Sequence, residues 1–182
     1  RERFIENYER TTLTAGQTAA LKALAARDGG PHHIAVIGED WCPDVYRGTG
    51  VAQRIAEAIG AELRYFERDQ NKDLIAEFLK DGEFEAIPVF VFYDREHREI
   101  AHFIERPTIA NEQLHLVKEV LGDNSPGAIA QRIGHEPSEE EVAAEKAAAS
   151  QRLDAWRQGP VWANWRVATI DEVIALLEQR LG

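Results

Sequence analysis

The sequence predicts an α/β fold in which helices flank a mixed sheet, with an N-terminal helix before it and a helical C-terminal extension after it. Three observations favour this fold. Strand-like and helix-like patterns alternate from residue 32 to residue 82, two β-rich runs follow with a short turn between them, and the last third contains helical patterns alone. Alternation is typical of parallel strands joined by crossover helices, and a short turn is typical of a hairpin. We therefore expect parallel and antiparallel pairing in one sheet.

The first helix begins after Thr14, which forms a capping-box pattern with Gln17. Leucines then recur at helical spacing until Gly29 and Gly30 end the pattern. The next run, HHIAVIG at residues 32–38, is rich in β-branched residues and has no helical period. It predicts a buried strand.

A second strand and two helices complete the parallel part. The apolar positions of residues 51–59 mark one face of a helix that Gly60 ends. The run AELRYFERD at 61–69 predicts the second strand, and NKDLIAEFLKDG at 71–82 predicts a helix closed by Gly82. Together with the first strand, this order predicts a parallel pair with crossovers.

The β-rich runs at 88–93 and 98–104 are separated by the polar turn DREH and predict a hairpin. A helix is then expected from Thr108 to Gly122. Further on, Ser138 with Glu141, and Thr169 with Glu172, have the capping spacing of two more helices. The sequence therefore predicts three parts, which are an N-terminal helical segment at residues 1–30, an α/β domain at 31–122 and a helical extension at 123–182 that packs on it.

Composition excludes several classes of function. The chain has 182 residues, 44% of them hydrophobic, and a net charge of -11, and no stretch gathers lysine and arginine into a stripe. We therefore expect no nucleic-acid partner. No apolar run approaches the roughly 20 residues of a membrane span, so we expect no membrane partner and a cytoplasmic protein. With one cysteine and six scattered histidines, neither an intrachain disulfide nor a structural metal site is expected.

Four short segments point to a known family. They are GEDWCPDV at 38–45, RDQNKDLIAEFL at 68–79, IPVFVFYD at 87–94 and IERP at 104–107. In this order they resemble the thioredoxin fold, and more closely a bacterial thioredoxin-like family whose members carry W-C-x-D-C. The resemblance covers roughly residues 30–122.

The resemblance implies roles for the residues of the W-C-P-D-V motif. It makes Cys42 the nucleophile and places Val45 where the family has its resolving cysteine. It also implies that Ile87 and a cis Pro88 face the thiol and line a groove for an extended partner segment. Val36 stands where thioredoxins carry a buried acid. The candidate site is therefore Cys42 as the catalytic residue, with Trp41, Pro43, Asp44, Val45, Ile87 and Pro88 as substrate-binding residues.

The reactivity of Cys42 depends on opposing influences. The free N–H groups and the dipole at a helix start favour a thiolate, which is the reactive form of cysteine. Carboxylates close in sequence, at Glu39, Asp40 and Asp44, oppose it, and Arg47 could offset one of them. The sign of the net shift is open at this stage.

Two functions follow from the same motif. In the first, Cys42 carries monothiol thiol-disulfide exchange or reversible thiolation in cell redox homeostasis, with a protein or a small thiol or disulfide as substrate. Glutathione or another low-molecular-weight thiol would be the co-substrate, with no other cofactor or metal, and dithiol reductase activity would be poor because Val45 has no thiol. In the second, the protein is a non-catalytic module whose groove or helical extension binds a partner, and Cys42 is a small buried hydrophobe.

Other residues have two interpretations each. Asp69 and Asn71 could lie at the edge of the site or cap the following helix, and Arg106 could face an anionic ligand or only form a strand-to-helix corner. Three tryptophans of the last third either bury the extension against the α/β domain or form an exposed patch for a partner: Trp156, Trp162 and Trp165. The adjacent His32 and His33 are expected to face solvent rather than bind a ligand.

Overall fold

The computed structural model describes residues 1–182, which form two compact units. The first unit comprises Arg1–Pro107 and Trp165–Gly182, and the second comprises Thr108–Asn164. The last stretch of chain therefore belongs to the same unit as the sheet. The division at residues 30 and 122 that the sequence suggests stays a prediction. No helix is long and apolar enough to cross a membrane.

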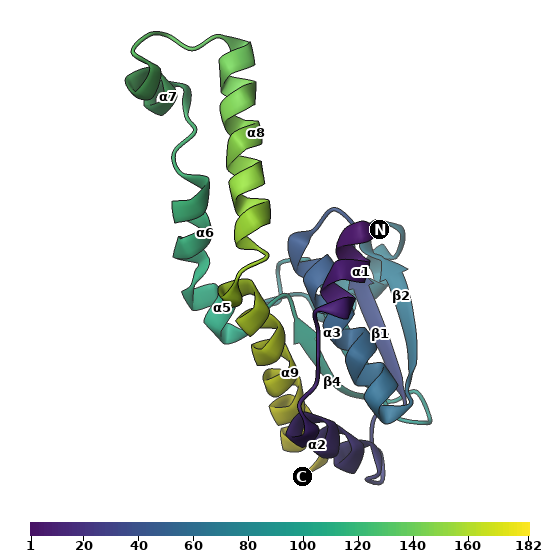
Figure 1. The fold of residues 1–182 in the computed structure, drawn as a ribbon. Helices are drawn as coiled ribbons and strands as arrows, with labels where there is room; N and C mark the ends of the chain where they lie inside the picture. The colour runs from purple at the N-terminus through teal and green to yellow at the C-terminus, as the bar shows by residue number, and fades with distance from the viewer. The chain divides into compact units, whose positions relative to one another are not determined.

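One four-stranded mixed sheet forms the centre of the first unit (Figure 1). Its strands are β1 (His33–Gly38), β2 (Glu62–Glu67), β3 (Val89–Tyr93) and β4 (Glu99–Ile104), in the order β2-β1-β3-β4. β1 pairs parallel with β2, whereas β3 pairs antiparallel with both β1 and β4. The predicted mixed sheet, with a parallel pair and a hairpin, is confirmed.

Helices of the first unit precede, connect and follow these strands. They are α1 (Glu2–Glu9), α2 (Ala15–Ala25), α3 (Pro43–Ile59), the single turns η1 (Arg68–Gln70), α4 (Lys72–Ile75) and η2 (Ala76–Phe78), and part of α9 (Pro160–Leu181). The capping box of Thr14 and Gln17 is present at the start of α2, and Gly60 ends α3 in the left-handed region at φ 70°. Both predictions from local pattern are confirmed.

The two faces of the sheet bury different clusters of apolar side chains. Because successive side chains of a strand point to opposite faces, Val36 and Phe90 contribute to one cluster while Ile37 and Val89 contribute to the other. We call the first the closed cluster, since α2, α3 and α9 all cover it; its buried members include Leu21, Leu24, Val51, Ile55, Ile170, Val173 and Leu177. We call the second the open cluster; its buried members are Ala35, Ile37, Val45, Ile75, Phe78, Ile87, Val89 and Val91.

Two predicted helices differ from those in the structure. The helix expected over 71–82 is present only as the turns α4 and η2 and ends at Phe78, because the chain leaves helical geometry at Leu79 and turns back through Asp81 (φ 56°) and Gly82 (φ 72°) to pair Lys80 with Phe84. The last helix is present, but its expected start at Thr169 is wrong, because Thr169 lies inside α9. Its hydroxyl donates to the Trp165 carbonyl over 2.8 Å, which satisfies a buried polar group without ending the helix.

The second unit is helical. It contains α5 (Thr108–Glu112), α6 (Leu114–Leu121), α7 (Pro126–Ile133) and α8 (Glu139–Trp156). The helix expected from Thr108 to Gly122 is interrupted at Gln113, and the capping box of Ser138 and Glu141 is confirmed. Figure 1 shows α6 and α7 beside the long α8. Arg152 of α8 donates to the last carbonyls of α6, which supplies partners for groups that the helix end leaves open.

Candidate active site at the start of α3

Cys42 occupies the N-cap position of α3, one residue before Pro43 at the first helical position. Its extended backbone (φ -80°, ψ 124°) turns the chain from β1 into the helix, and its carbonyl accepts hydrogen bonds from the Val45 and Tyr46 N–H groups. Proline fits at the first helical position because the N–H it lacks would have no partner within the helix. The sequence Cys-Pro therefore places the sulfur at the first turn, as predicted.

The loop before β3 faces this sulfur. The Ile87–Pro88 peptide bond is cis, as the resemblance implied, and the Ile87 carbonyl oxygen lies 3.8 Å from Cys42 Sγ. Both residues of the loop are buried, whereas the thiol is half-buried. The structure thus brings three of the predicted site residues together around one partly accessible sulfur.

Val45 is completely buried. It belongs to the open cluster, against which Cys42 also packs. A Cβ atom on Gly38 would lie 2.7 and 2.8 Å from the two methyl carbons of Val45, so a larger residue at the end of β1 would force Val45 or its surroundings to shift. The position to which the family resemblance assigned a resolving cysteine therefore holds a tightly packed aliphatic side chain.

Asp44 is held between two arginines. Arg47 Nη1 lies 2.8 Å from one of its carboxylate oxygens, and Arg106 Nη2 lies 2.9 Å from the other. Arg47 is one helical turn further along α3 and is 1% exposed, while Arg106 comes from the corner after β4 and also pairs with Glu105. Two cations therefore compensate the carboxylate nearest to the thiol.

The net effect on Cys42 is unfavourable to the thiolate. Burial raises the pKa of the Cys42 thiol, and the Asp44 carboxylate raises it further. The N–H groups of Val45 and Asp44 and the Arg106 guanidinium act in the opposite direction, but the pKa stays above its ordinary value. The question left open by the sequence is therefore answered in favour of a mostly protonated thiol at neutral pH.

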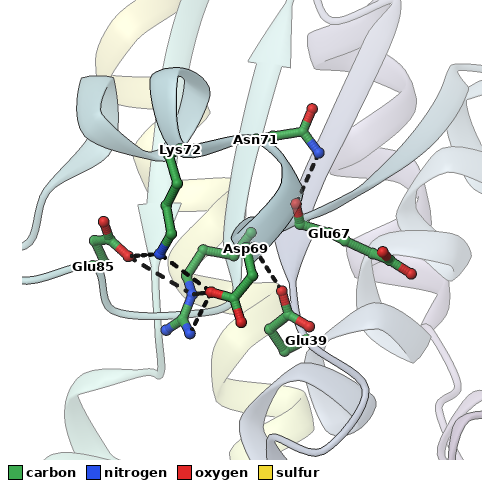
Figure 2. Close-up of polar contacts among 7 residues, drawn as sticks. Glu39, Glu67, Asp69, Asn71, Lys72 and Glu85 are labelled. Atoms are coloured by element: carbon green, nitrogen blue, oxygen red, sulfur yellow. Dashed lines mark hydrogen bonds and ion pairs between the residues drawn. The ribbon is translucent and has the colours of Figure 1, made fainter.

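Further carboxylates lie beside the site. Burial raises the pKa of the Tyr65 phenol, and the charges of Glu39, Asp40 and Glu67 raise it further. Glu39 accepts a hydrogen bond from the Asp69 N–H over 2.8 Å, which ties the loop after β1 to the end of β2 (Figure 2). The surface beside the thiol is therefore acidic.

The charged segment at the end of β2 forms its own network. Lys72 Nζ lies 2.6 Å from a Glu85 oxygen and 3.2 Å from an Asp69 oxygen (Figure 2). Asn71 donates to the Glu67 carbonyl over 2.8 Å, and no side chain caps α4. The prediction that Asp69 or Asn71 caps this helix is wrong, because both side chains bind the preceding residues or the following lysine instead.

Trp41, a predicted substrate-binding residue, is exposed. Its side chain is 60% exposed, and the Arg68 guanidinium carbon lies 5.5 Å from the ring centroid. Arg68 also pairs with Asp69 over 2.8 Å. The sequence did not predict a role for Arg68. Its only signal was its position in the RDQN segment, which also contains Asp69 and Asn71.

Arg106 is a corner residue that also has an electrostatic role. The Glu105 N–H donates to the Pro88 carbonyl over 2.7 Å, which fixes the corner against the cis-proline loop. Arg106 therefore faces an anion of the chain itself, the Asp44 carboxylate, rather than being free for a ligand. The sequence offered no signal for this pair because the two residues lie in separate segments.

The tryptophans and histidines are placed as follows. Trp162 and Trp165 are buried, which is incompatible with an exposed aromatic patch formed by them. Trp162 packs edge-to-face with Trp156 at 6.1 Å.

His32 and His33 are both half-buried, and the His33 ring stacks on that of His97 at 4.1 Å. No group of three or more side chains that commonly bind metals is placed to hold an ion.

Comparison with known proteins agrees with this architecture. Residues 1–120 match the model of the thioredoxin family. A protein of unknown function from Pseudomonas aeruginosa is similar in structure, with a TM-score of 0.57, 20% identity, and an alignment that covers 98% of this chain and 81% of that one. An HIV epitope-scaffold is similar with a TM-score of 0.54 and 19% identity, over 98% of this chain and 82% of that one. At such identities the likeness shows the fold alone. No curated protein matches the chain.

Proposed function

The chain belongs to the thioredoxin family, and we propose that it is a monothiol relative of the W-C-x-D-C group that undergoes reversible thiolation at Cys42 in redox homeostasis. One observation carries this proposal. The only sulfur of the chain is half-buried at the first turn of α3 and lies 3.8 Å from the Ile87 carbonyl, beside the cis Pro88. A thiol in this position can meet an incoming disulfide while the surrounding backbone holds it in place.

The reaction needs a disulfide R–S–S–R as the oxidant. The Cys42 thiol loses its proton to water, and the thiolate attacks one sulfur of the disulfide. A Cys42–S–S–R bond forms, the R–S–S–R bond breaks, and R–S⁻ leaves and takes up a proton. An external thiol reverses the step by attacking the mixed disulfide, so Cys42 returns to its reduced form.

The raised pKa of Cys42 influences both directions of this exchange. Little thiolate is present at neutral pH, so attack on a disulfide is slow. Cys42 is also a poor leaving group, since leaving ability falls as the pKa of the departing thiol rises. Val45 offers no second thiol to displace the bound group. These properties support a slow, persistent modification rather than rapid catalytic turnover.

The acidic surface favours some partners over others. Glutathione carries a net negative charge, and the Glu39, Asp40 and Glu67 carboxylates that act on Tyr65 would repel it. A neutral or cationic thiol or disulfide, free or within a protein, suits the site better. Glutathione therefore remains a chemically competent but disfavoured co-substrate in this proposal.

A second candidate function is protein binding without thiol chemistry. It is favoured by Trp41, which is 60% exposed with Arg68 over its ring, since exposed aromatic residues often anchor partner proteins. In that case the fold would supply a groove, and the thiol would add nothing to the interaction.

The test is the intact mass of the protein after incubation with neutral hydroxyethyl disulfide at pH 7 and pH 9. We expect one adduct, formed faster at pH 9, that a reducing thiol removes and that Cys42→Ser lacks. Serine is a close match in size, so the variant serves as a folded control. A folded wild-type protein that takes no adduct at pH 9 would contradict the thiolation proposal and leave the binding module.

A further inference from the structure

We propose that Trp165 is a positioning residue of the thiol site, which keeps Arg47 on Asp44 and thereby makes the C-terminal helix α9 part of the machinery that sets Cys42 reactivity. Trp165 lies outside the residues 1–120 that match the thioredoxin family model. The inference rests on the proposed function for its biological meaning, but the contact itself is testable without any disulfide exchange.

Trp165 of α9 contacts Arg47 of α3. The Arg47 guanidinium carbon lies 5.3 Å from the centroid of the Trp165 ring, and each residue is 1% exposed. Both belong to the same compact unit. A guanidinium over the face of an indole ring is attracted by the ring's charge distribution, and the attraction grows when water is excluded. The ring therefore restricts where this buried cation can lie.

Arg47 in turn forms an ion pair with Asp44. Burial lowers the pKa of Arg47, while the Asp44 carboxylate raises it, as expected for a buried cation that depends on its anion. The pair is one of two on this carboxylate, since Arg106 binds the other oxygen. Displacement of Arg47 would leave Asp44 with one cation instead of two.

Four charged or titratable groups are coupled to the thiol, namely Asp44 and Arg47 from α3, Tyr65 from β2 and Arg106 from the corner after β4. Glu39 and Asp40 of the preceding loop act on Tyr65. Asp44 disfavours the thiolate, whereas Arg106 and the coupled charge of Arg47 favour it. If Asp44 loses the compensation that Arg47 provides, its charge disfavours the thiolate more strongly. Trp165 would therefore support Cys42 reactivity without touching the sulfur.

The experiment measures the rate of Cys42 alkylation by iodoacetamide from pH 7 to pH 10.5 on the full chain, which has a single thiol. Trp165→Met fills much of the volume but removes the ring face. We expect its rate at pH 7.5 to fall about threefold, with the pH profile moved to higher pH, as for a shift of roughly half a pKa unit. Trp165→Phe retains a ring face and should stay within about twofold of the wild type.

The matched control is Trp162→Met. Trp162 lies on the same helix and is 4% exposed, but its ring contacts Trp156 and the Arg157 guanidinium instead. This variant should lose stability without moving the alkylation profile. If Trp165→Met and Trp162→Met move the pH profile of alkylation equally, the proposal is overturned, because the change is then a general effect of loosened packing.

A double variant isolates the route through Asp44. Asp44→Asn should raise the alkylation rate at pH 7.5, and adding Trp165→Met to it should then change the rate by less than about twofold. If Trp165→Met still causes the full threefold loss when Asp44→Asn is already present, a route through the carboxylate is contradicted.

One further measurement needs no substitution at Trp165 and therefore does not depend on how its variants fold. In the wild type, the Arg47 side-chain N–H resonances should be shifted by the indole ring current and should move when Cys42 is alkylated. Resonances that stay fixed on alkylation would overturn the inference. If the protein forms no disulfide adduct but shows the expected changes in alkylation rate and in Arg47 resonances, the proposed function is refuted and the role of Trp165 stands.

Discussion

The two faces of the sheet use the same kinds of side chain for different purposes. The closed cluster is covered by three helices, and residues such as Ile55 and Val173 have no exposed surface. The open cluster is equally apolar, but it borders the half-buried Cys42. Cys42 packs against the open cluster and not against the closed one. Substitutions in the closed cluster are therefore expected to change stability alone, whereas substitutions beside Val45 are expected to change the reactivity of Cys42 as well.

The largest expected effect on stability lies in the closed cluster. Ile55→Ala removes buried methyl groups between α3 and the sheet, and should lower the free energy of unfolding by about 2–5 kcal/mol. Urea denaturation measures this loss. The alkylation rate of Cys42 in the folded variant should match the wild type, so a shift in its pH profile would break the distinction between the two clusters.

A smaller loss of stability, joined to a change in reactivity, is expected at Gly38. In Gly38→Ala the new methyl would meet the Val45 methyl carbons at 2.7 and 2.8 Å, so β1, the Val45 side chain or the first turn of α3 must move. We expect a loss of about 1–3 kcal/mol in the free energy of unfolding. The thiol should also become more accessible and react faster with iodoacetamide.

The control for this change is Gly127→Ala in α7. A Cβ atom on Gly127 meets nothing within 4 Å, so the substitution should be neutral or slightly stabilising. If Gly38→Ala behaves like this control, the close approach of β1 to Val45 has no bearing on the site.

The smallest expected effect concerns the charge of the partner. At low ionic strength Cys42 should react faster with cationic cystamine than with neutral hydroxyethyl disulfide, and slowest with anionic oxidised glutathione, each rate being divided by that of free cysteine. We expect the relative rates for successive disulfides to differ by about twofold to fivefold, and these differences should shrink in salt because the carboxylates act through solvent. Asp40→Asn, at an exposed position, should reduce the differences in rate. A preference for oxidised glutathione would contradict the role given to the acidic surface.

Local patterns predicted the parts of the molecule that neighbouring residues determine. The capping boxes at Thr14 and Ser138 depend on residues three positions apart, and both are present. The same local reasoning failed at Thr169, because a threonine inside a helix can satisfy its hydroxyl on the carbonyl four positions earlier. It failed again after Phe78, where the pairing of Lys80 with Phe84 ended the helix.

The candidate site shows the same division. Cys42 at a helix start and the cis bond before Pro88 could be predicted from the motif and the family resemblance. The contacts of Asp44 with Arg106 and of Arg47 with Trp165 join distant segments, and single-residue patterns carry no signal for them. The direction of the shift in the pKa of Cys42 could not be predicted either, since it depends on burial and on which charges are compensated.

The central claim is that Cys42 acts as a monothiol whose mixed disulfide persists because Val45 cannot resolve it. The most direct test follows the intact mass of the wild type and of Val45→Cys after equal treatment with hydroxyethyl disulfide and removal of the excess. Residues three apart on a helix lie on the same face, and cysteine is no larger than valine, so the new thiol should reach the adduct. We expect the wild-type adduct to persist until an external thiol is added, and the variant to lose its adduct and form an internal disulfide. A wild-type adduct that disappears as quickly as the variant's, with no added thiol, would contradict the account.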